Sequence, residues 1–109
     1  MLLIVTKFLI PRGYRGITIF PFVFIRYKED RENVVLINHE RIHLRQQLEL
    51  LILPFFILYV LEFIFRLFEY KNFNIAYRNI SFEREAYSNE KNLQYLTNRK
   101  LFSFAKFIF

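Results

Sequence analysis

The first third of the chain groups its apolar residues in the way that β-strands do. Residues 2–10 are rich in branched aliphatic side chains, and residues 17–27 form a second, more aromatic run. Two glycines punctuate the chain between these runs, so we expect a hairpin that turns near residues 11–16. Pro21 lies inside the second run and cannot donate a hydrogen bond to a neighbouring strand. The second run is therefore predicted to be an edge strand or to carry a bulge.

Beyond a charged patch at residues 28–32, the pattern becomes helical. Asp30 or Asn33 offers the side-chain oxygen that an N-cap needs, and the helix is expected to extend to about residue 53. A second polar, helix-forming sequence covers residues 75–96. The expected fold class is α+β: a short N-terminal antiparallel hairpin or sheet packed on the first helix, with two or three further helices. The length of 109 residues fits a single domain, residues 1–109.

The segment between the two predicted helices is the most apolar part of the chain. Residues 50–61 carry no charge, and apolar residues continue to residue 68 around Glu62 and Arg66. A spanning helix needs about 20 apolar residues, and Pro54 predicts a kink or break, so a buried helix or one in the membrane interface fits better than a transmembrane helix. Residues 50–68 are therefore the candidate membrane contact.

Composition narrows the function classes. Apolar residues make up 54% of the chain and include 15 phenylalanines, which predicts that part of an apolar surface faces a lipid, a partner or another copy. The net charge of +6 comes from 16 Lys and Arg that never form a dense block, so nucleic acid is an unlikely partner. The start of the chain lacks a basic stretch and a small-residue cleavage site, which reads poorly as a signal peptide. The expected location is membrane-associated or cytoplasmic.

The chain has only two histidines, and both lie in one His-Glu-x-x-His frame. On a helix, His39 and His43 project from the same face one turn apart, so both imidazoles reach one ion. Glu40 follows the first ligand directly and lies where it can take a proton from a metal-bound water. The alternative is a pair of ordinary histidines on a helix surface. With no cysteine in the chain, the third ligand of a zinc ion must be a carboxylate.

Two glutamates of the second predicted helix are the best candidates for that carboxylate. Glu83 and Glu85 differ by about 200° around a helix axis, so only one of them faces the histidines. Tyr87 and Glu90 share the face of Glu83, four and seven residues beyond it. Helical phase alone does not choose between the two glutamates. The alternative is a solvated face with Arg84 between them.

With these two motifs the chain resembles the gluzincin metallopeptidases, whose membrane-linked branch often carries Glu-x-Glu-Ala-Asp on the second helix. This chain reads Glu-Arg-Glu-Ala-Tyr from Glu83 to Tyr87. The resemblance implies a zincin-like fold, Zn²⁺ as cofactor, and hydrolysis of peptide bonds in a peptide or protein substrate near a membrane. It also implies that Glu83 is the third zinc ligand beside His39 and His43, with Glu40 as catalytic residue.

One position departs from that pattern, because Tyr87 stands where the family has an aspartate that orients the first histidine. Glu90 is a candidate substitute for it. The Tyr87 hydroxyl is the first candidate to stabilise a developing oxyanion, ahead of Tyr77 and Arg78. The resemblance further implies that a substrate peptide adds to the sheet edge at residues 17–25. A partly covered strand is the alternative.

Two other functions fit parts of the sequence. The first is a catalytically inactive metal-binding or membrane-associated structural protein with the same fold. The second is a basic nucleic-acid binder, for which no binding motif is present. Gln46 and Gln47 follow the histidine motif, and we expect them to be solvated and to have no role in the site.

Overall fold

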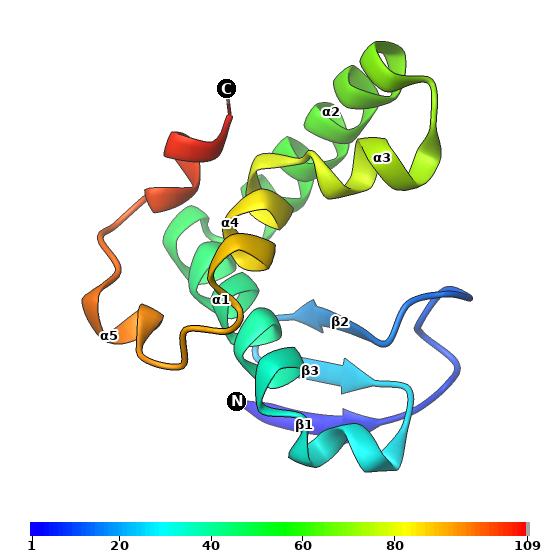
Figure 1. The fold of residues 1–109 in the computed structure, drawn as a ribbon, viewed down its shortest axis with the longest axis vertical. Helices are drawn as coiled ribbons and strands as arrows, with labels where there is room; N and C mark the ends of the chain where they lie inside the picture. The colour runs from blue at the N-terminus through cyan, green and yellow to red at the C-terminus, as the bar shows by residue number, and fades with distance from the viewer. Residues whose placement is uncertain (109) are drawn as a thin grey trace.

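A small sheet lies on one side of the molecule and the helices on the other (Figure 1). The structure is a computed structural model, and it describes residues 1–108. Its strands are β1 (Leu2–Val5), β2 (Gly16–Ile19) and β3 (Phe22–Ile25). Its α-helices are α1 (Val34–Leu50), α2 (Ile52–Tyr70), α3 (Phe73–Arg78), α4 (Ser81–Asn89) and α5 (Tyr95–Asn98), with 3-10 helices η1 (Lys28–Glu32) and η2 (Ser103–Phe107). The predicted mixed α+β class is confirmed.

The pairing of the strands differs from the prediction. The sheet order is β1-β3-β2, with β3 parallel to β1 and antiparallel to β2. The expected hairpin between residues 2–10 and 17–27 is therefore wrong, because the hairpin lies within the second run and turns at Pro21. Pro21 has no N–H for a ladder, while its carbonyl accepts a hydrogen bond from the Leu2 amide. Of the predicted edge at residues 17–25, only the β2 part lies at an edge.

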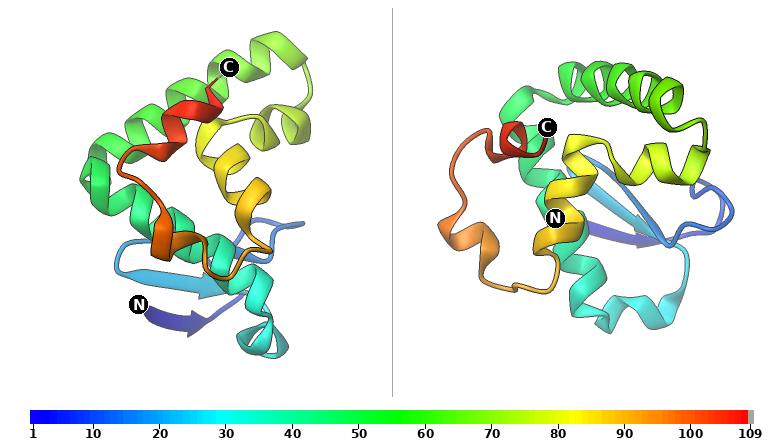
Figure 2. Two further views of the ribbon diagram at one scale, coloured as in Figure 1. Left: turned by 60° about the vertical axis from the view of Figure 1, so that its left-hand side comes forward. Right: turned by 45° about the horizontal axis from the view of Figure 1, so that its top comes forward.

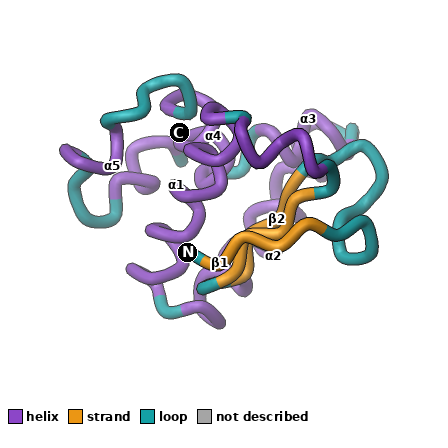
Figure 3. The backbone as a smooth tube through the Cα atoms, turned by 90° about the horizontal axis from the view of Figure 1, so that it is seen from below, coloured by secondary structure: helices purple, strands orange, loops and turns teal. Residues whose placement is uncertain are grey.

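Helix α1 packs on the sheet against β2 and carries the histidine motif. Its N-cap is Asn33, whose side chain accepts a hydrogen bond from the Leu36 amide, so of the two N-cap candidates Asn33 is confirmed. The residues Val23 and Ile25 of the central strand and Ile42 of α1 are fully buried. Figure 3, seen from the sheet side, shows the strands as one layer. The sheet thus supports the helix on which the histidines lie.

The apolar segment forms helix α2, but this helix is not buried. Only Phe55 and Arg66 are buried along it, so the expectation of a buried helix is wrong. The chain bends by 111° between α1 and α2 at Leu51, which has a positive φ of 60°. Pro54 lies within the first turn of α2, where its missing N–H breaks no hydrogen bond of that helix, and the break predicted at Pro54 falls three residues earlier, at Leu51. Among residues 1–108, no single helix has the length and apolar composition to cross a membrane, whereas the bent pair of α1 and α2 together does.

The expected helix at residues 75–96 is also wrong, since α3, α4 and α5 occupy this part of the chain. The break between α3 and α4 falls at Ile80, which is fully buried against Phe55 and Phe82 in the apolar core. Ile80 offers no side-chain cap, and the Glu62 carboxylate of α2 accepts hydrogen bonds from the Ser81 amide and hydroxyl instead. Tertiary contacts, rather than helix propensity, set where α4 begins.

Candidate metal centre

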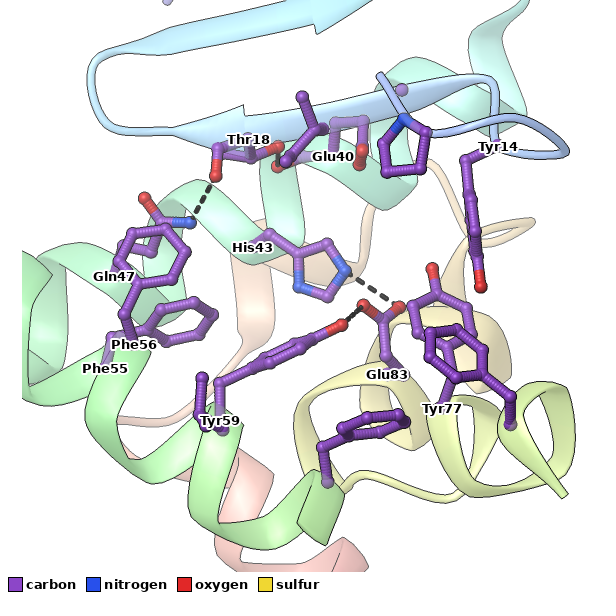
Figure 4. Close-up of a pocket in the computed structure, with 16 residues that line it drawn as sticks. Tyr14, Thr18, Glu40, His43, Gln47, Phe55, Phe56, Tyr59, Tyr77 and Glu83 are labelled. Carbon is purple, nitrogen blue, oxygen red and sulfur yellow. Dashed lines mark hydrogen bonds and ion pairs between the residues drawn. The ribbon is translucent and has the colours of Figure 1, made fainter. Parts of the chain in front are cut away.

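Two histidines of α1 and one glutamate of α4 meet at a single point. His39 Nε2 lies 3.2 Å from Glu83 Oε1, and His43 Nε2 lies 3.0 Å from the same oxygen. The two Nε2 atoms are 3.2 Å apart, and all three side chains are buried. Figure 4 shows the His43 imidazole directed at the Glu83 carboxylate. The three predicted ligands are thus brought together by α1 and α4.

The proton of His43 is located by the hydrogen bonds on the far side of its ring. His43 Nδ1 lies 2.8 Å from Gln46 Oε1. The Gln46 amide nitrogen donates to the Phe82 carbonyl and to the Glu85 carboxylate, so the Gln46 oxygen is left as an acceptor. In its neutral form His43 therefore carries its proton on Nδ1 and turns the Nε2 lone pair toward Glu83.

His39 is oriented in the same sense by an acid beyond the end of α4. Its Nδ1 lies 3.0 Å from Glu90 Oε1, and an ionised carboxylate accepts hydrogen bonds only. The Asn38 side chain donates to the main-chain carbonyls of Asn89 and Glu90, which fixes this end of α4 against α1. Glu90 is thus in contact with His39, as expected of a residue that replaces the aspartate of the gluzincin pattern. Like His43, neutral His39 directs a lone pair into the site.

The spacing of the three acceptor atoms fits a tetrahedral metal ion. Zinc holds nitrogen and carboxylate oxygen at about 2.0–2.1 Å, which places neighbouring ligand atoms of a tetrahedron about 3.3 Å apart. The three distances between His39, His43 and Glu83 are 3.0–3.2 Å. Two imidazole lone pairs and a carboxylate repel one another unless a positive charge lies between them. The donor set and its geometry therefore fit zinc with three protein ligands.

Without a metal, a proton on His43 supplies the positive charge. Burial lowers the pKa of His43, but the negative charge and hydrogen bond of Glu83 outweigh burial and raise this pKa to about 9. The Glu83 carboxyl responds in the opposite direction: burial favours its neutral form, yet His43 and His39 hold its pKa well below the usual range. The centre thus binds a cation in either state, and a metal ion competes with a proton for it.

Glu83 and Glu85 have different surroundings although both are buried. The Glu85 carboxylate is fully buried in hydrogen bonds to Gln46, Tyr95 and Arg99 and contributes no atom to the cluster of acceptors. Arg99 also pairs with Glu49 of α1, and its own side chain is fully buried. The alternative of a solvated glutamate face is wrong, because α4 is enclosed by α1 on one side and the chain around Arg99 on another.

The sequence analysis assigned no role to Gln46 and Gln47, and both are completely buried. Gln46 orients His43. Gln47 bridges α1 to the edge strand, since its amide donates to the Thr18 carbonyl and its oxygen accepts from the Phe20 amide. Helical spacing could have identified both glutamines as neighbours of the site, because residues three and four positions after His43 lie on the same helix face.

Tyr59 of α2 is a second residue that the sequence analysis missed. Its hydroxyl donates to Glu83 Oε2 at 2.6 Å, which leaves Oε1 of the same carboxylate directed at the two histidines. Tyr59 lies in an apolar run that gave no reason to separate it from the core-forming phenylalanines around it. A third element, α2, therefore helps to hold the third candidate ligand.

Glu40 lies beside the histidines without joining the three converging atoms. Its carboxylate is within 4.8 Å of the imidazole nitrogens, and its Oε2 is buried without a hydrogen-bond partner among residues 1–108. Burial raises the pKa of Glu40. Gly16 of β2 leaves room for it, because a Cβ on Gly16 would lie 3.2 Å from Glu40 Oε1. A buried, unpartnered carboxylate of this kind has the properties of a general base.

Two cavities adjoin the centre, and Glu40 and Gly16 line both of them. The first, about 390 Å³, reaches His43 and Glu83 and is mostly apolar, with walls from α2, α3 and β2 (Figure 4). The second, about 350 Å³, reaches His39 and Glu90 and is more polar. Together they give the centre access on two sides.

Tyrosines line these cavities on the side opposite α2. The Tyr14 hydroxyl is buried and has no hydrogen-bond partner in the described part of the chain, and its ring packs edge-on against Tyr77. The Tyr87 ring packs against the His39 ring. The Arg78 guanidinium lies over the Tyr87 ring, 4.0 Å from its centre. Tyr87 thus supports the position of His39, while Tyr14 offers the free hydroxyl. The sequence analysis did not name Tyr14, because it lies in a turn with no motif around it.

The outer edge of β2 has peptide groups that face away from the sheet. The Arg26 amide donates to the Arg15 carbonyl, so in this antiparallel ladder the peptide groups of Gly16 and Thr18 point outward. Gln47 takes the Thr18 carbonyl. The N–H and carbonyl of Gly16 and the N–H of Thr18 remain for an added strand.

Comparisons with protein-family models, with curated proteins and with solved structures gave no match to this chain. The resemblance to gluzincins consequently rests on the two short motifs alone. The observations that indicate a function therefore lie in the centre formed by α1, α4 and the edge of β2.

Proposed function

We propose that this protein is a zinc-dependent peptidase. One observation carries the proposal: two imidazole nitrogens and one carboxylate oxygen converge at 3.0–3.2 Å beside Glu40, whose Oε2 has no hydrogen-bond partner among residues 1–108. His39, His43 and Glu83 would hold the ion. Three protein ligands leave a fourth position free, as in catalytic rather than structural zinc sites.

The proposed chemistry divides between the ion and the chain. When bound, zinc supplies a Lewis acid that polarises a peptide carbonyl and lowers the pKa of a coordinated water. Glu40 removes a proton from the attacking water and delivers it to the leaving amine. Its raised pKa brings this carboxyl closer to neutral pH, where a general base works best. The Tyr14 hydroxyl, buried and without a partner, donates to the oxyanion that develops on the substrate.

The edge of β2 positions the substrate in this proposal. An extended peptide adds to β2 through the free N–H and carbonyl of Gly16 and the N–H of Thr18. Such a strand passes Glu40, because the Glu40 carboxylate packs closely against the Cα of Gly16 in this edge strand. The apolar cavity next to His43 accepts a large apolar side chain beside the scissile bond.

The test separates metal binding from catalysis. Zinc-loaded protein is incubated with a defined mixture of unstructured peptides, and cleavage is followed by mass spectrometry. We expect Glu40→Gln to keep about one zinc per chain while cleavage falls by about 10²–10⁴-fold. Glu32→Gln, a change at an exposed glutamate, serves as the control and keeps full activity. Wild-type protein that holds zinc and cleaves no peptide would refute the peptidase and favour the inactive metal-binding alternative.

A further inference from the structure

The face of α2 that points away from the rest of the molecule is entirely apolar. Seven side chains on this face are each 45–79% exposed: Leu53, Ile57, Val60, Leu61, Ile64, Phe65 and Phe68. Their spacing of three or four residues makes one continuous band along the helix, which we call the outer stripe. Figures 1 and 2 place α2 at the periphery of the molecule. The outer stripe is therefore open along its whole length.

The inward face of the same helix carries its polar groups. Tyr59 binds Glu83, Glu62 caps α4 at Ser81, and Arg66 pairs with Glu69 and binds a main-chain carbonyl of the C-terminal segment. A helix at a water-exposed surface shows the opposite arrangement, with apolar residues inward and charges outward. The inner face of α2 holds both its polar groups and the core residue Phe55, while the outer face is apolar although exposed. An apolar medium on the outer side accounts for this exposed apolar face.

The composition of the outer stripe favours lipid over a protein partner. The stripe extends over about 23 Å, at about 1.5 Å per residue from Leu53 to Phe68, without one polar or small side chain. Protein interfaces of this size carry hydrogen-bonding groups at about one per 100–200 Å² and a polar rim. The outer stripe offers none. Large aliphatic and aromatic side chains alone are typical of helices that lie in a bilayer interface.

The charge of the exposed surface identifies the kind of lipid. Eleven of the 16 Lys and Arg are exposed, against three of the ten Asp and Glu, because most acids are used inside the protein. Lys71, at the C-terminal end of α2, is among the exposed bases. Lys and Arg near an anionic bilayer are attracted to its headgroups and strengthen binding. The exposed charge therefore complements anionic headgroups.

We infer that the outer stripe of α2 docks on the surface of an anionic lipid bilayer, with its side chains among the acyl chains, Lys71 at the headgroups and the net positive charge of the exposed surface attracting the chain to the bilayer. This inference stands apart from the proposed peptidase activity, since it uses no residue of the metal centre. Val60 belongs both to the outer stripe and to the wall of the apolar cavity. Docking consequently brings that cavity next to the bilayer.

The chain contains no tryptophan, so a single substitution provides a clean fluorescent reporter. Phe65→Trp places the indole on the outer stripe, and Val34→Trp places it at an exposed position at the start of α1. Vesicles of phosphatidylcholine with roughly 30% phosphatidylglycerol, an anionic lipid, are added at low salt. We expect a blue shift and quenching by brominated acyl chains for Phe65→Trp, and neither for Val34→Trp.

Three outcomes would overturn the inference. The first is an unchanged Phe65→Trp spectrum with every vesicle. The second is equal binding to vesicles of phosphatidylcholine alone, which would remove the role of charge. The third is a blue shift that depends on protein concentration without vesicles, which would show that a second copy covers the outer stripe. As a check on the stripe itself, the pair Leu61→Ser and Phe65→Ser should abolish vesicle sedimentation of the otherwise native chain, whereas Val34→Ser should not.

Discussion

The space between α1 and α4 and the outer face of α2 reverse the usual distribution of polar and apolar residues. Between the helices lie two buried histidines, three buried glutamates and the buried side chain of Arg99. On the outer face of α2 lies an uninterrupted band of exposed aliphatic and aromatic side chains. The comparison teaches that neither region is explained by folding in water alone. In our proposals, the interior binds a cation and the exterior meets an apolar medium.

The polar interior is tolerated because its groups bind one another. Burying a polar group without a partner costs about 1–3 kcal/mol, and burying an unpaired charge costs more. Among residues 1–108, three buried side-chain polar atoms lack a hydrogen-bond partner. Two of them, Tyr14 Oη and Glu40 Oε2, face the cavities beside the metal centre. Unsatisfied groups are thus concentrated where a water and a substrate would bind.

The largest effect is expected when the charge balance of the interior is broken. Arg99→Met removes the cation between Glu85 and Glu49, whose side chains are 0% and 3% exposed. We expect the free energy of unfolding to fall by about 3–5 kcal/mol, because two carboxylates stay buried without their partner. Urea denaturation of the metal-free protein measures this loss.

Arg15→Met is the control: Arg15 pairs with Asp30, whose side chain is 5% exposed, but the Arg15 side chain is itself 55% exposed, so water can replace it at the carboxylate. A partly solvated pair of this kind contributes about 0–1 kcal/mol. Equal losses for the two variants would contradict the view that the interior depends on buried pairing.

A smaller effect should separate the two neighbouring glutamines. Gln46→Met removes the acceptor that orients His43, and we expect zinc affinity to fall by about 10–100-fold. Gln47→Met removes the link to Thr18 and Phe20 and should leave zinc affinity unchanged while lowering kcat/KM for peptides. Competition with a zinc chelator measures the first quantity, and peptide cleavage measures the second. Loss of zinc affinity in both variants, or in neither, would show that the glutamines do not divide the roles in this way.

The histidine site was readable from the sequence because its geometry is local. His39 and His43 lie on one helix, where a spacing of four residues fixes their relation. Glu83 lies forty residues further along, and its convergence with the histidines depends on how α4 packs on α1. The helical phase that separates Glu83 from Glu85 could be predicted. The buried state of Glu85 could not, because Arg99 is distant in the sequence.

Non-local contacts explain what the sequence analysis got wrong. Residues 17–27 have the composition of one strand, yet they split at Pro21 so that β3 can lie between β1 and β2. Residues 75–96 have the composition of one helix, yet the helix is interrupted at Ile80, which is buried in the apolar core. The composition of residues 50–68 predicted a buried helix or one in the membrane interface, and only the contacts of α2 show that its polar side chains face inward.

The proton on His43 gives the metal centre a defined pH dependence. Its pKa in the metal-free folded protein is raised from 6.5 to about 9, so the His43–Glu83 pair contributes its full stability below pH 6.5. That contribution is lost as the pH rises through about 9. Zinc must displace this proton, so its affinity should increase with pH up to about 9 and then level off.

Calorimetric titration of the metal-free protein with zinc tests the central claim most directly. At pH 7, in two buffers of different ionisation enthalpy, we expect about one zinc to bind per chain with release of about one proton. His43→Ala and Glu83→Gln should each abolish tight binding, and Glu85→Gln should retain it. Wild-type protein that binds no zinc between pH 7 and 9, or binding that survives both His43→Ala and Glu83→Gln, would contradict the account.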